Sequence, residues 1–156
     1  MNDFQFRLES LLELRAEAEA AAAGSLATAQ SEATEAERAH EELEDARGET
    51  RNELIRLQDQ GTGAGRLQSI RLLVERLEQS IELAVERLNM AREILSERRD
   101  EYHRANRERR ALEELKAKRH SAWSRDTARR DQRVMDEIAT NRHLKGSHSL
   151  SSGGKA

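Results

Sequence analysis

Apolar residues recur at alternating steps of three and four along much of the second half of this chain. The apolar stripe begins at Leu67 and ends at Leu95. This spacing places one narrow apolar strip on an α-helix and leaves the rest of its surface to water, which is typical of a coiled coil. The same spacing runs on to Trp123 with more polar members. Its apolar members are Leu67, Ile70, Val74, Leu77, Ile81, Ala84, Leu88, Ala91 and Leu95.

The first half of the chain carries a weaker stripe of the same kind. It starts with large residues at Phe4 and Leu8 and then consists mostly of alanine. Alanine favours helix but buries little area, so we expect this stripe to pack closely and weakly. The predicted positions after Leu8 are Leu11, Arg15, Ala18, Ala22, Ser25, Ala29, Glu32, Ala36, Ala39, Leu43, Ala46, Thr50, Glu53 and Leu57.

Helix breakers divide the chain at two places. The chain has no proline, and six of its eight glycines cluster at 61–65 and in the last eleven residues. We therefore predict a helix over 4–60, a turn over 61–65 and a helix over 66–143. These segments form one hairpin domain over 1–145, and the Ser- and Gly-rich stretch 146–156 is predicted to be a flexible tail.

The predicted fold is all-α: a long antiparallel two-helix coiled-coil hairpin with an overhanging second helix. Folding about Gly63 pairs positions whose numbers sum to roughly 126, which brings Phe4 and Phe6 near Trp123. The second helix then extends about 20 residues, or ~30 Å, beyond this aromatic end. Residues 1–60 hold 15 acids and 6 bases, whereas 98–133 hold 13 bases and 7 acids, so the opposed charges favour the antiparallel pairing.

The composition argues against an enzyme. Aromatic residues are only 3% of the chain and cysteine is absent, so neither an aromatic-lined pocket nor a thiolate site is indicated. The glycine turn lacks the lysine and hydroxyl residue of a phosphate-binding loop. We predict no catalytic residue, no cofactor and no metal, because the histidines have no partner histidine at helical spacing. The histidines are His40, His103, His120, His143 and His148.

Three features leave alternatives open. The basic stretch 98–133 could contact nucleic-acid phosphate, but acids are interleaved with its arginines, and neutralisation by the first helix is the favoured interpretation. Beyond Trp123 the second helix has no partner, and there basic and apolar residues indicate either a docking surface or a frayed end. Leu73 lies one step off the apolar stripe, either as part of a second stripe with Leu77 or as a widened coiled-coil core.

Both ends of the chain resemble a known family. The opening Phe4-Gln5-Phe6-Arg7-Leu8-Glu9-Ser10-Leu11-Leu12-Glu13-Leu14-Arg15 resembles the start of FliJ-type flagellar export proteins. The segment Asp131-Gln132-Arg133-Val134-Met135-Asp136-Glu137-Ile138-Ala139 is similar to that family's C-terminal signature. The resemblance covers nearly the whole chain, including the position of the turn.

The resemblance implies a non-catalytic central stalk or adaptor of the flagellar type III export apparatus, and hence a role in motility and chemotaxis. It implies three partners: a hexameric export ATPase that receives the end carrying both termini, the cytoplasmic domain of the export gate, and export chaperones. It implies no nucleic acid and no direct membrane insertion. The location implied is cytoplasmic and peripheral to the inner-membrane export apparatus, which agrees with the lack of an apolar run of ~18 residues.

Site residues follow from the resemblance and from position. The family's gate-contacting stripe would fall on Leu73, Leu77, Ser80 and Ala84. The surface expected to dock in the ATPase ring consists of Phe4, Phe6, Trp123, Arg129, Arg130, Arg133, Met135 and Ile138. Two other functions stay open: a stalk protein of an injectisome secretion system, which shares the architecture, and a general coiled-coil scaffold or nucleic-acid-binding protein using 98–133.

Overall fold

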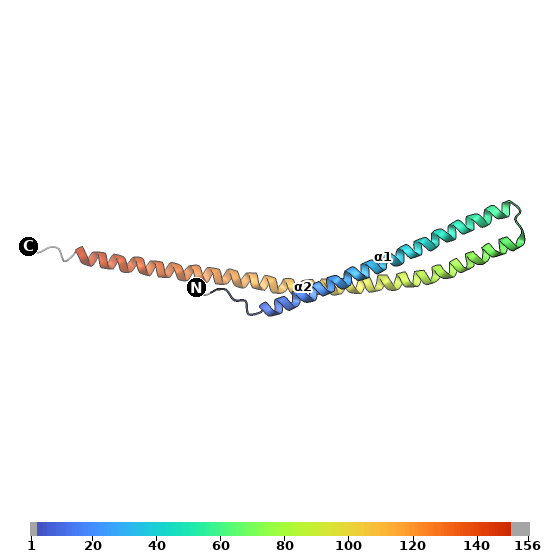
Figure 1. The fold of residues 1–156 in the computed structure, drawn as a ribbon. Coiled ribbons are helices and arrows are strands. Elements are labelled where there is room, and N and C mark those ends of the chain that lie inside the picture. Colours follow the sequence, from blue (N-terminus) through green and yellow to red (C-terminus); the bar gives the residue numbers. More distant parts are fainter. Residues whose placement is uncertain (1–2, 151–156) are drawn as a thin grey trace, which may run out of the picture. The chain divides into compact units, whose positions relative to one another are not determined.

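The computed structural model describes the backbone of residues 3–150 and the side chains of residues 3–143. Within this part the chain forms two α-helices, α1 (Glu9–Asp59) and α2 (Ala64–Leu150), joined by a short turn (Figure 1). The helices pack against each other, and the predicted all-α helical hairpin is confirmed. Among the described side chains, seven are buried: Phe6, Ala29, Ala33, Leu57, Ile81, Ala84 and Leu88.

Helix α1 begins at Glu9, five residues later than predicted. Residues 3–6 have no regular secondary structure, and the Glu9 amide donates to the Phe6 carbonyl at 3.0 Å. On a helix, Phe4 and Phe6 would face nearly opposite sides, whereas residues two apart in an extended segment face the same side. Because residues 3–6 are not helical, both rings reach α2.

Helix α2 continues to Leu150, seven residues beyond the predicted end at residue 143. The extra stretch contains one glycine and no proline. A single glycine costs a helix only about 1 kcal/mol relative to alanine, so it does not force the helix to end. Residues 151–156 of the predicted flexible tail lie outside the described residues.

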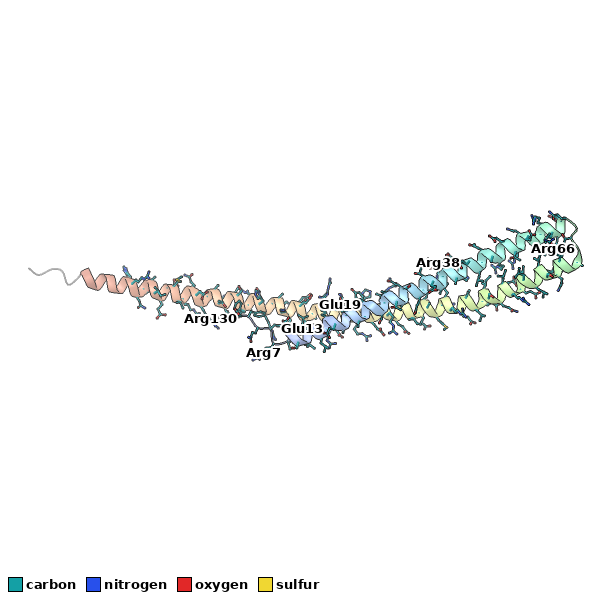
Figure 2. All side chains as sticks on the ribbon, viewed as in Figure 1. Arg7, Glu13, Glu19, Arg38, Arg66 and Arg130 are labelled. Carbon is teal, nitrogen blue, oxygen red and sulfur yellow. The ribbon has the colours of Figure 1, made fainter. Side chains whose placement is uncertain are left out.

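The turn is closed by a capping motif at the end of α1. The Thr62 amide donates to the Leu57 carbonyl at 3.1 Å, and the Gly61 amide donates to the Gln58 carbonyl at 3.2 Å. Gly61 has a φ of 69°, the left-handed conformation that this Schellman motif requires and that glycine adopts without strain. The Gly63 carbonyl then accepts from Leu67 at 3.3 Å and begins α2. Arg66 lies beside this turn (Figure 2).

The helices contribute to two compact units, one formed by residues 14–108 and one by the described parts of 1–13 and 109–156. In the first unit every predicted apolar position of α2 is buried or half-buried, from Leu67 to Leu95. In the second unit Leu112, Lys116 and Trp123 are likewise half-buried. The spacing of α2 was therefore predicted correctly from Leu67 to Lys116 and at Trp123, whereas the predicted position Arg119 is exposed.

The α1 stripe was wrong at every second position before Leu43. The predicted residues Leu11, Ala18, Ser25, Glu32 and Ala39 are exposed. The next residue along the chain is covered in each case: Leu12, Glu19, Leu26 and His40 are half-buried, and Ala33 is buried. After Leu8 the next covered residue in the structure is Leu12, four residues on, whereas the prediction placed Leu11, three residues on, in the stripe. This places the large Leu26 against α2 and leaves the charged Glu32 in water, which lowers the cost of desolvation.

Polar pairs fix the antiparallel alignment within residues 14–108. Arg15 contacts Glu108 at 2.7 Å and Arg92 contacts Glu37 at 2.7 Å. The Asn106 amide donates to Glu19 at 2.6 Å, and Arg51 pairs with Glu78. These partners lie within a few residues of the pairing that folding about Gly63 predicts. The ionic pairs are largely exposed, so each stabilises the hairpin by at most about 1 kcal/mol.

Candidate functional site

A groove of about 520 Å³ lies between α1 and α2 within residues 14–108. Its centre is formed by small side chains from both helices, Ala36 and Ala39 of α1 with Ser80 and Ala84 of α2. Ala84 is buried, while Ser80 is exposed and donates its hydroxyl to the Arg76 carbonyl at 3.0 Å. Small residues on facing helices leave room that larger residues would fill. The remaining lining residues are Glu32, Glu35, Leu43, Leu83 and Arg87.

The structure separates the four residues of the predicted gate stripe into three settings. Ser80 and Ala84 lie in the groove. Leu77 is half-buried on the apolar stripe that faces α1, whereas Leu73 is 47% exposed. Leu73 therefore belongs to the surface rather than to a widened core.

The sequence prediction of this site missed its α1 side. Ala36, Ala39 and Leu43 line the groove, yet their spacing predicted only positions in the helix-helix stripe. Their spacing of three and four was the available signal. Alternate positions of the predicted α1 stripe before Leu43 were one residue too early, and Ala39 is one of them. The exposed Ala39 was therefore predicted in the interior instead of in the groove wall.

The aromatic residues at the start of the chain meet α2 as predicted. The Phe4 ring packs against His120 with centroids 5.0 Å apart and against Trp123 at 6.0 Å. Phe6 is only 8% exposed, and the Arg119 guanidinium carbon lies 5.8 Å from its ring centroid, within reach of a cation–π interaction. Lys116 fastens the beginning of α1 nearby through a 2.8 Å contact with Glu9. We call Phe4, Phe6, His120 and Trp123 the aromatic cluster.

Residues 128–143 of α2 are all exposed. Val134, Met135 and Ile138 are 55%, 67% and 43% exposed. Within the described part of the chain, Arg129, Arg130 and Arg133 form no ion pair. Arg129 and Arg133 are four residues apart and share one side of the helix, whereas Val134 and Ile138 share another. The predicted docking residues thus form a basic side and an apolar side, and Arg130 is among those labelled in Figure 2.

Charge in the basic stretch 98–133 is partly compensated. Arg98 donates to both carboxylate oxygens of Glu101 at 3.0 and 2.8 Å, and this hydrogen bond raises the pKa of Arg98 above its ordinary value. Arg109 contacts Glu113 at 2.5 Å along α2. Lys116 pairs with Glu9 of α1. The compensation therefore comes from α2 itself as well as from the acidic first helix.

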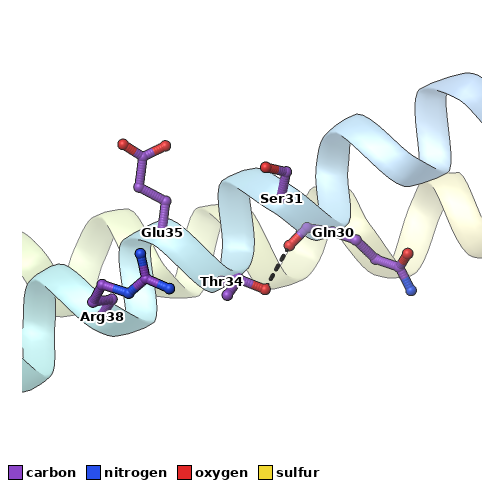
Figure 3. A pocket seen from close by; sticks show the side chains of 5 residues that line it. All are labelled: Gln30, Ser31, Thr34, Glu35 and Arg38. Carbon is purple, nitrogen blue, oxygen red and sulfur yellow. Dashed lines mark hydrogen bonds between the residues drawn. The ribbon is translucent and has the colours of Figure 1, made fainter.

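A second hollow, of about 530 Å³, lies along α1 (Figure 3). Its lining residues are Gln30, Ser31, Thr34, Glu35 and Arg38. The Thr34 hydroxyl donates to the Gln30 carbonyl at 2.9 Å, so it is used within the helix. In the close-up the Glu35 carboxylate points away from the helix, whereas the Arg38 side chain lies across the ribbon, so the two do not meet at a common point. The hollow does not have the converging polar groups of a ligand site.

The described residues contain neither a metal site nor a membrane-spanning helix. No group of three or more His, Cys, Asp or Glu side chains there could hold a metal ion. No helix in that part of the chain is long and apolar enough to cross a membrane.

Comparison with known proteins gives one match. Residues 4–147 match the family model described as the flagellar FliJ protein. No curated protein and no solved structure matches the chain. The matched range includes α1, the turn and nearly all of α2.

Proposed function

Because this chain belongs to the flagellar FliJ family, a family of coiled-coil proteins associated with flagellar type III export, we propose that it is a non-catalytic stalk and adaptor of the export apparatus. In this proposal it docks in the hexameric export ATPase, contacts the cytoplasmic domain of the export gate and meets export chaperones. It acts in the cytoplasm, peripheral to the inner membrane. The family match over 4–147 is the observation that carries the proposal.

We assign ATPase docking to the aromatic cluster and to the exposed end of α2. The support is exposure: Arg129, Arg130 and Arg133 lie on a stretch of α2 where every described side chain is open to solvent. The end of α2 has a basic side and an apolar side, so within a six-fold ring it would contact the six subunits unequally. Unequal contacts favour one subunit conformation at a time. The protein thereby changes ATPase activity without carrying a catalytic group.

Charge reversal tests the ATPase assignment. The triple variant Arg129→Glu, Arg130→Glu, Arg133→Glu should bind the purified ATPase more weakly, with a loss that shrinks as salt rises. Circular dichroism should show unchanged folding, because these side chains are exposed. The matched control reverses Arg38, Arg66 and Arg71, which are also exposed. Normal stimulation by the first variant at low and moderate salt would remove the basic side of α2 from the docking surface.

We assign gate binding to Leu73, Leu77, Ser80 and Ala84 together with the groove. The support is that Ser80 and Ala84 line a groove together with Leu43 and Leu83, where an apolar side chain of a partner could be received. Leu73→Asp should weaken gate binding and leave the free energy of unfolding within about 0.5 kcal/mol. Leu77→Asp should weaken binding and also lower the melting temperature, because Leu77 is half-buried.

A variant that fills the groove is a more direct test. Ala39 is exposed and forms part of the groove wall, so Ala39→Trp should block the groove without disturbing the helix-helix contact. Ala27→Trp, at another exposed alanine of α1, is the matched control. Equal gate binding by both variants, measured by titration calorimetry, would place the gate contact elsewhere on the hairpin.

A further inference from the structure

A row of large, exposed apolar residues lies on α2 beside the apolar stripe that packs on α1. Leu83, Met90 and Ile94 are 56%, 59% and 41% exposed. They are spaced by seven and four residues, two turns and one turn, and therefore share one side of the helix. Leu72, 46% exposed, continues this side toward the turn. We call Leu83, Met90 and Ile94 the outer stripe; none of them belongs to the apolar stripe that packs on α1.

A column of acidic residues runs beside the outer stripe. Glu82, Glu86 and Glu93 are exposed, and their spacing of four and seven places them on one flank of it. Within the described part of the chain none of the three takes part in a hydrogen bond or ion pair. Arg87 lies on the opposite flank. We call the three glutamates the acidic flank.

We propose that the outer stripe and the acidic flank bind an amphipathic α-helix that carries basic residues along one edge. The apolar residues of such a helix, at steps of three and four, would cover Leu83, Met90 and Ile94. Its lysines or arginines would lie against Glu82, Glu86 and Glu93, which have no cation of their own. With three apolar anchors the contact belongs to the small, transient class of interfaces.

Charge decides between this partner and other occupants. Three uncompensated carboxylates repel the phosphates of nucleic acids and of anionic lipid surfaces. An antiparallel two-fold pair of this chain through the same stripe would set the acidic flank of one copy against that of the other, because like edge positions meet in such a pair. A basic-edged helix satisfies both features. This inference does not rest on the proposed export function, and it shares only Leu83 with the groove.

The test uses a labelled synthetic peptide as the probe. The peptide is about 18 residues long, or ~27 Å as a helix, with leucines at alternating steps of three and four and lysines along one edge. A second peptide has glutamate in place of every lysine. Binding to the full chain is measured by fluorescence anisotropy. The lysine peptide should bind at least about tenfold more tightly than the glutamate peptide at moderate salt.

Variants locate the binding surface. Glu82→Lys, Glu86→Lys, Glu93→Lys together should abolish or invert the preference for the lysine peptide. Glu17→Lys, Glu41→Lys, Glu49→Lys, at exposed positions of α1, change the net charge equally and should keep the preference. Met90→Ser with Ile94→Ser should weaken the lysine peptide about tenfold. Circular dichroism should show the same melting temperature for all three variants.

Four outcomes would overturn the proposal. The first is a lack of saturable binding of the lysine peptide. The second is an equal loss of preference in the two triple variants, which would indicate attraction by net charge alone. The third is unchanged affinity in the Met90 and Ile94 variant. The fourth is a dimer of the unmodified protein, seen by sedimentation, that the Met90 and Ile94 variant disrupts.

Discussion

The Phe4 ring meets the His120 imidazole edge to face, with centroids 5.0 Å apart and planes at 90°. This contact joins the extended start of the chain to the surface of α2. Phe6, two residues later, is nearly covered at 8% exposure. The segment before α1 is therefore held by two rings of unequal burial, and the two should differ in how much they stabilise it.

Phe6→Ala should destabilise the aromatic end more than Phe4→Ala. Burying a phenylalanine side chain contributes about 1.5–3 kcal/mol, and Phe4 is only half-buried. Trp123 is the only tryptophan of the chain, so its fluorescence reports on this end directly. Denaturation followed by Trp123 emission should shift further for Phe6→Ala. A larger shift for Phe4→Ala would contradict the observed burial.

The corrected α1 stripe can be tested with two neighbouring residues. Leu26 is half-buried and Ser25 is exposed. Leu26→Asp should lower the free energy of unfolding by about 1–3 kcal/mol, because a carboxylate is taken out of water without a partner. Ser25→Asp should change it by less than about 0.5 kcal/mol. Chemical denaturation followed by circular dichroism makes the comparison. The reverse order would restore the stripe predicted from the sequence.

Glycine substitutions should have opposite signs at two positions. Gly61 has a φ of 69°, so Gly61→Ala should destabilise the hairpin by about 1–2 kcal/mol. Gly48 lies within α1, and a Cβ there would have no atom within 4 Å. Gly48→Ala should therefore stabilise α1 by about 0.5–1 kcal/mol. Melting temperatures of the two variants give the signs. Stabilisation by Gly61→Ala would mean that the turn does not need the left-handed conformation.

Distances in solution test the hairpin itself. The chain has no cysteine, so single labels can be introduced at the exposed positions Ser10 and Ala117. In the hairpin the two labels should lie within about 20 Å, given helix axes 8–10 Å apart plus the label arms. Electron paramagnetic resonance measures this distance. One open continuous helix would separate the two labels by ~160 Å, at about 1.5 Å per residue, so the lack of a distance near 20 Å would contradict the hairpin.

The fold could be predicted because apolar residues, most of them large, mark the side of α2 that faces α1. From Leu67 to Leu95 every stripe position is apolar, which leaves a single choice of helix face. Residues 8–40 of α1 offer alanine on several sides, so spacing alone did not distinguish the step from Leu8 to Leu11 from the step to Leu12. The two choices differ by one residue, and only the facing surface of α2 selects between them.

The candidate site was harder to predict than the fold. Ser80 and Ala84 were named because of the family resemblance, but the α1 wall of their groove depends on which side of Ala36 and Ala39 faces α2. The extended start of the chain was missed for another reason. Phe4 and Phe6 do not have the spacing of one helix face. Their placement depends on contacts with α2, such as those of Phe4 with His120 and Trp123, which the local sequence does not show.

The cross-helix pairs within residues 14–108 alternate in sign along α1, with a cation at Arg15, an anion at Glu37 and a cation at Arg51. Sliding one helix along the other by a turn would break all of these pairs together and would also move the alanines out of their contacts. These pairs are individually weak, but together they oppose sliding of one helix along the other. A pull or push applied to one helix of this unit is consequently carried by both, and this stretch can transmit force along its axis without stretching.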